Sequence, residues 1–191
     1  MGAGMVYAVV GGIELFGPGA VSEATLAGLR QVFQLFFIIL LSLSMRELYY
    51  RLPYNDAGKT PVSHGQARLL EAVFMGVVFV EFAVIIAIGL TEAIQAVQAL
   101  ASVAFAVYGI SFAAGTRAEA MTSGTVIDSM LVRFIAVLTC LGAAGALDGG
   151  TLVGLPPALV AGATTVFITM SATFLLALAI RLKANVETMS P

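Results

Sequence analysis

One acidic side chain lies near the centre of a long apolar run, and it is the first candidate for chemistry in this sequence. The run is residues 69–90, LLEAVFMGVVFVEFAVIIAIGL, and the acid is Glu81. About 20 apolar residues in a helix cross the hydrocarbon core of a bilayer. An ionised group at that depth costs about 2.5–3.5 kcal/mol on insertion scales. Its presence therefore predicts a pairing partner, a bound proton or a function that uses the charge.

Amide side chains on two other apolar runs are expected at a similar depth. Gln95 and Gln98 share a helical face with Thr91 and Ser102, because the four residues are spaced four, three and four apart. Further polar groups occupy the first half of the run 25–49. Together these side chains predict a polar lane in one half of a helical bundle. The polar lane comprises Arg30, Gln31, Gln34, Gln95, Gln98 and, at its floor, Glu81.

Two interpretations of the polar lane are open. In the first, Arg30 or Gln34 pairs with Glu81, and the lane only holds helices together. Hydrogen bonds of this kind contribute about 0.6 kcal/mol each on average in membranes. In the second, the lane lines a water-filled vestibule in which Glu81 binds a proton or a cation, since acids inside membranes are functional candidates by default.

A second group of charges is predicted nearer the other end of the spans. Glu71 lies one turn into its helix, Asp128 begins the fourth span, and Arg133 follows within two turns. A long arginine side chain can extend along its helix toward the interface. We therefore expect Arg133 to form a structural ion pair with Glu71 or Asp128 that fixes helix register.

Small residues recur at every fourth position on the last two runs, and such spacing lets helix backbones approach closely. We interpret these faces as packing seams, with a contact between copies of the chain included. A pore-lining row of threonines is the alternative. We expect Thr169→Leu to weaken packing more than Leu175→Ala. The small faces are Ala161, Thr165, Thr169, Thr173 and Ala177 on one run, and Ala136, Cys140 and Ala144 on the other.

Residue types that are missing from the apolar runs exclude several functions. The single histidine, His64, lies in a loop, so a bis-histidine haem or a zinc site within the membrane is not expected. No lysine lies in a span, which excludes a retinal Schiff base. The nine Lys and Arg residues are scattered and give no nucleic-acid footprint. We expect no enzymatic activity, no cofactor and no nucleic-acid partner.

The elements that must position these residues are membrane helices. The 191 residues are 60% hydrophobic and only 10% charged, with a mean hydropathy of +1.01, whereas soluble domains carry about 25% charged residues. The prediction is one all-α membrane domain over 1–191, a bundle of five transmembrane helices plus an apolar N-terminal segment. Residues 5–16 lie at the membrane surface, pack on the bundle or form a sixth span. The expected spans are 25–49, 69–90, 93–114, 126–147 and 157–182.

The distribution of basic residues predicts the topology. Lys and Arg flank the loop 51–66, but the turn at Thr91 and the loop 148–155 contain none. Basic residues are enriched in cytoplasmic loops. We therefore expect the loop 51–66 and the C-terminus in the cytoplasm of a prokaryotic cell, with the chain in the cytoplasmic membrane.

The polar lane indicates a small transporter- or channel-type protein in which Glu81 carries the charge, surrounded by Arg30, Gln34 and Gln98. The alternative is a non-catalytic accessory or assembly subunit of a membrane protein complex. Expected partners are the lipid bilayer and either a second copy of the chain or another membrane subunit. The two functions differ in whether Glu81 faces an internal cavity or an outward groove.

Overall fold

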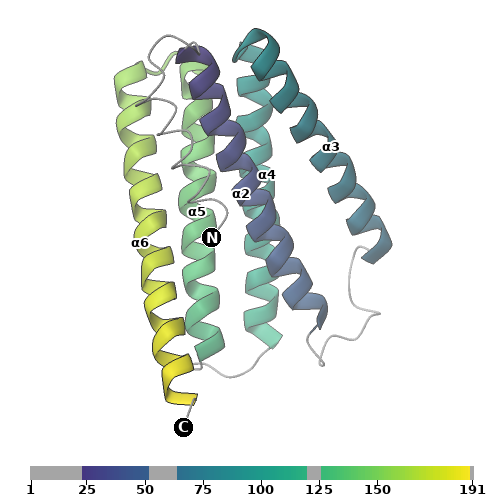
Figure 1. Cartoon of the computed structure of the whole chain (residues 1–191), viewed down its shortest axis with the longest axis vertical. Helices are drawn as coiled ribbons and strands as arrows, with labels where there is room; N and C mark the ends of the chain where they lie inside the picture. The colour runs from purple at the N-terminus through teal and green to yellow at the C-terminus, as the bar shows by residue number, and fades with distance from the viewer. Residues whose placement is uncertain (1–22, 52–63, 120–125, 190–191) are drawn as a thin grey trace.

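Five long helices run side by side in the computed structural model, which describes residues 23–51, 64–119 and 126–189 (Figure 1). A short 3-10 helix, η1 (Gly149–Val153), joins the last two. The described part of the chain contains no strand. The long helices are α2 (Glu23–Arg51), α3 (His64–Ile88), α4 (Glu92–Glu119), α5 (Val126–Asp148) and α6 (Pro157–Met189).

All five long helices are long and apolar enough to cross a membrane, which confirms the predicted all-α bundle of five spans. The chain is therefore a multi-pass membrane protein in contact with lipid. Four of the five predicted spans fall within one of these helices, but the span 69–90 runs past the end of α3 at Ile88. Elsewhere the helices extend as far as the apolar runs or further. α3 begins at His64, inside the predicted loop 51–66, and α6 continues to Met189. Hydropathy marks the edge of the hydrocarbon, whereas a helix continues into polar residues that favour it. Residues 5–16 and 52–63 lie outside the described residues.

The helices do not pack equally. α4 makes extensive contact with both α2 and α5, while α6 packs mainly on α5 and α3 mainly on α2. Figure 1 shows α3 leaning at the edge of the bundle. α2, α4 and α5 are consequently the centre of the molecule, and α3 and α6 are peripheral.

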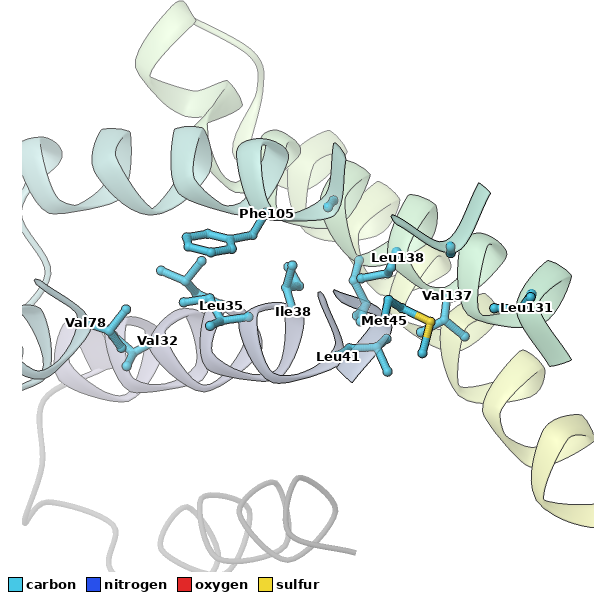
Figure 2. Close-up of a cluster of buried hydrophobic side chains, with 14 of the residues drawn as sticks. Val32, Leu35, Ile38, Leu41, Met45, Val78, Phe105, Leu131, Val137 and Leu138 are labelled. Atoms are coloured by element: carbon cyan, nitrogen blue, oxygen red, sulfur yellow. The ribbon is translucent and has the colours of Figure 1, made fainter. Parts of the chain in front are cut away.

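The apolar core lies where α2 meets its neighbours (Figure 2). α2 contributes Val32, Leu35 and Ile38, which are almost fully buried, and Phe105 of α4 packs against them. The peripheral helices present large apolar side chains outward, among them Phe79 on α3. Lipid rather than water surrounds such side chains, so their exposure is no liability.

Glycines let α4 and α5 approach each other closely. A Cβ atom at Gly142 would lie 2.5 Å from the Cβ of Ala106, and one at Gly149 would lie 2.7 Å from the Cβ of Ala99. Gly145, between them, faces Ser102 in the same way. We call Gly142, Gly145 and Gly149 the glycine seam. Gly142 and Gly145 lie three apart on one face of α5, and Gly149 follows four residues later as the first residue of η1.

The predicted seam on α6 points away from the bundle. Thr165, Thr169 and Thr173 are exposed, and each hydroxyl donates to the backbone carbonyl four residues earlier. The prediction that this face packs within the chain is wrong. α6 is packed through a different face, which includes Val160 and Leu178. On α5, by contrast, Cys140 and Ala144 are buried and Ala136 is partly buried.

Candidate functional site

A polar pocket lies between α2, α4 and the end of α5. It is an open recess of about 190 Å³, solvent space included, and it has room for about one water molecule. We call it the amide pocket, because four glutamines contribute to its wall. It is lined by Gln31, Gln34, Gln95, Gln98, Ala99, Ser102, Gly145 and Asp148.

Helical spacing and the glycine seam create the amide pocket. Gln95, Gln98 and Ser102 lie on one face of α4, and Gln31 and Gln34 lie three apart on α2. Gly145 has no side chain on the facing surface of α5, and a Cβ there would collide with Ser102. The seam that lets the backbones approach therefore leaves the space that the amides surround.

Hydrogen bonds fix part of the wall. Gln34 Nε2 donates to the Leu141 carbonyl at 3.3 Å. Gln95 Nε2 donates to the Asp148 backbone carbonyl at 2.5 Å and to Thr151 Oγ1 at 3.0 Å. These hydrogen bonds connect α2 and α4 to α5 and η1, so they hold the walls of the pocket in place.

Other polar atoms of the wall have no partner among the described residues. Gln98 is only 3% exposed, yet neither its Oε1 nor its Nε2 forms a hydrogen bond, and Gln31 Oε1 is unpartnered as well. Leaving a buried donor or acceptor unsatisfied costs about 1–3 kcal/mol. Most buried polar groups in native proteins are satisfied by protein or by water, and a water molecule is the simplest occupant that would satisfy these atoms.

Glu81 lies on the other side of Gln98. Its carboxyl group, on α3, faces the Gln98 amide, and the residue is 7% exposed. Its Oε2 atom is buried without a hydrogen-bond partner in the described part of the chain. Neither Arg30 nor Gln34 pairs with it: Gln34 binds the Leu141 carbonyl, and Arg30 is exposed and lies close enough to Asp148 for their charges to interact.

The structure brings the four glutamines of the polar lane together, with Glu81 beside Gln98 and Arg30 near Asp148. Asp148 is a lining residue that appears in the sequence analysis only as the start of the loop 148–155. Its Oδ1 accepts a hydrogen bond from Thr164 Oγ1 at 3.1 Å. An acid directly before Gly149, where an apolar span ends, is the signal that could have identified it.

A second buried polar cluster lies at the opposite end of the bundle. Arg46, only 3% exposed, contacts Glu71 through Nη1 and Oε2 at 2.5 Å and donates to Glu47 Oε1 at 2.6 Å. Tyr108 donates to Glu71 Oε1 at 3.2 Å. We call Arg46, Glu47, Glu71 and Tyr108 the Arg46 network. It connects α2, α3 and α4.

The predicted pairing of Arg133 needs correction. Glu71 pairs with Arg46, because α2 is central and turns this arginine inward. Asp128 contacts Arg117 Nε at 2.5 Å, since α4 ends beside the start of α5. Arg133 donates instead to the carbonyl and hydroxyl oxygens of Ser129, one turn earlier.

Among residues 23–51, 64–119 and 126–189, no group of three or more His, Cys, Asp or Glu side chains could hold a metal ion. The chemistry available at the site is therefore that of carboxyl, amide and hydroxyl groups. Comparison of the chain with models of known protein families, with curated proteins and with solved structures finds no match.

Proposed function

We propose that this protein is a small transport protein that moves a proton or a small cation across the membrane by way of Glu81. The observation that carries the proposal is the buried Glu81 Oε2 atom, which has no hydrogen-bond partner in the described part of the chain, in a carboxyl group that interacts only with the neutral amide of Gln98 within a membrane bundle. A carboxyl group in that setting is available to bind and release a charged species.

The same helix offers an internal comparison. Glu71, also on α3, is 8% exposed, nearly the same as Glu81. It is satisfied by an arginine and a tyrosine hydroxyl. A buried acid with a purely structural role is expected to have such partners, because an uncompensated buried charge is costly. Glu81 has none of them, which supports a role that needs its free oxygen.

The contacts between α3 and α4 suggest a route with a closed section. Glu81 faces Gln98 at one level, and Glu71 binds Tyr108 at another. Between these levels the rings of Phe74 and Phe105 pack edge to face, with centroids 4.8 Å apart. An apolar constriction between two polar regions is a recurrent way to close a pathway.

The test is flux in reconstituted vesicles under an imposed proton or sodium gradient. Glu81→Gln keeps the size and a hydrogen-bonding end but removes the ionisable group, so it should abolish the flux. Glu92→Gln, the same change at an exposed position at the start of α4, is the matched control and should retain it. Wild-type rates in the Glu81→Gln protein would refute the proposal.

One observation favours an accessory or assembly subunit as the second candidate. The exposed threonines of α6 give this helix an outward face of small residues, which in membranes suits contact with another helix. Under this proposal, purification in mild detergent yields a second membrane protein in fixed ratio, and Thr169→Leu releases it. Both candidates treat the protein as non-catalytic.

A further inference from the structure

We propose that the amide pocket is a binding site for a single small monovalent cation such as Na⁺. The inference builds on the proposed function, because Gln98 separates this pocket from Glu81 and an ion bound here would lie one side chain from the acid. Its test is equilibrium binding, which does not require that any ion crosses the membrane.

The lining chemistry is that of a cation site. Oxygen atoms of Gln31 and Gln98 are buried without partners, and the Asp148 carboxyl group also borders the space. Thr164 binds one oxygen of that carboxyl group, Oδ1. The unsatisfied groups also include the Gln98 Nε2 donor, so the atoms available to a cation are the two amide oxygens and the Asp148 carboxyl group. Hard cations are bound by carboxylate and amide oxygens of this kind.

The volume of the pocket and the number of its oxygen ligands indicate the size and charge of the ion. Room for about one water molecule favours a small ion over an organic substrate, and the oxygens of the wall would replace part of the hydration shell of that ion. Ca²⁺ takes six to eight oxygen ligands, and Mg²⁺ gives up its waters reluctantly. One carboxyl group and a few amides suit a monovalent ion better.

Arg30 sets the strength of binding. It lies close enough to Asp148 for their charges to interact, so it partly offsets the field of the carboxyl group. The site is therefore expected to bind weakly, as a site on a conduction path must if the ion is to leave again.

Binding is measured on purified protein in detergent with radiolabelled Na⁺, and by thermal unfolding in NaCl against choline chloride at equal ionic strength. Na⁺ should bind and stabilise the wild-type protein, whereas choline is too large for the pocket. Asp148→Asn should weaken binding at least about tenfold, which corresponds to about 1.4 kcal/mol. Asp128→Asn, the same substitution near the other end of α5, should leave binding unchanged.

Two further variants keep the test decisive if Asp148→Asn folds poorly. Arg30→Gln removes the opposing charge and should tighten Na⁺ binding. Gln98→Glu adds a carboxyl group to the wall and should also tighten Na⁺ binding. If the substitution only disturbed packing, Na⁺ binding would weaken instead. Identical unfolding curves in NaCl and choline chloride with no labelled Na⁺ retained, or an undiminished Na⁺ effect in Asp148→Asn, would overturn the inference. Na⁺ binding without flux would support this inference while refuting the proposed function.

Discussion

At the scale of single residues, α3 carries two buried acids in opposite circumstances. Glu71 belongs to the Arg46 network, whereas Glu81 interacts with the neutral amide of Gln98 and its Oε2 atom has no hydrogen-bond partner in the described part of the chain. Removal of Glu71 and removal of Glu81 should therefore change the free energy of unfolding by different amounts or in opposite directions. Stability measurements on the two positions test the assignment of one as structural and the other as functional.

Arg46→Met should strongly destabilise the protein, because it leaves Glu71 buried without its cation. Breaking a buried pair by removing one partner costs about 3–5 kcal/mol. The double variant Arg46→Met/Glu71→Leu should recover much of this loss, since it removes the stranded charge. Unfolding in mixed micelles gives the free energies, with Arg51→Met at an exposed position as the control. A small effect of Arg46→Met would contradict a stabilising role for the network.

Glu81→Leu should unfold at the same denaturant concentration as the wild-type protein or at a higher one. The reason is that it removes a buried oxygen that has no partner and strands no cation. Glu71→Leu is the matched comparison and should be destabilising, because Arg46 is then left unpaired. A Glu81→Leu protein that unfolds as readily as Glu71→Leu would mean that Glu81 has a stabilising partner.

At the scale of elements, the glycine seam holds α4 against α5. Gly142→Ala should destabilise the bundle by about 1–3 kcal/mol, the usual range for an overpacked contact. The added methyl group would lie 2.5 Å from Ala106 Cβ, so the helices must separate. Gly162→Ala on α6 is the control, because nothing lies within 4 Å of a Cβ there. Thermal unfolding in detergent compares the two, and equal stability would argue against the close approach.

The exposed face of α6 reverses an expectation from the sequence. Thr169→Leu should leave the stability of the isolated chain unchanged, since its side chain faces outward. Leu175→Ala should be the more damaging change, because Leu175 packs against the core. Unfolding is measured in detergent at protein concentrations low enough to keep single copies apart. A larger loss for Thr169→Leu under these conditions would mean that this face packs within the chain.

At the scale of the whole molecule, the topology is still a prediction from the basic residues. Lys59→Cys on a Cys140→Ser background should resist an impermeant thiol reagent in intact cells, because the loop 51–66 is expected in the cytoplasm. A cysteine at Val153, in η1 at the other end of the bundle, should be labelled. Labelling of the Lys59→Cys protein would invert the orientation.

Much of the architecture could be predicted from the sequence, because the length and apolarity of each run are local properties. The meeting of Gln95 and Gln98 with the glutamines of α2 also followed from spacing and depth. Asp148 and Arg46 were missed as interior residues because their surroundings depend on which helices are neighbours. Hydropathy carries no information on which helices are neighbours. For the same reason Arg133 was predicted as a partner of Glu71, which pairs with Arg46 instead.

The attachment of α3 at both ends has a mechanical consequence. Near its start, α3 is held by an ion pair and a tyrosine hydroxyl, and at its end only Gly89, Leu90 and Thr91 separate it from α4, with Ile85 fully buried. A helix fixed at both ends bows between its supports and does not swing. Any displacement of α3 would then be smallest near Glu71 and near Ile88 and largest between them, where Glu81 lies.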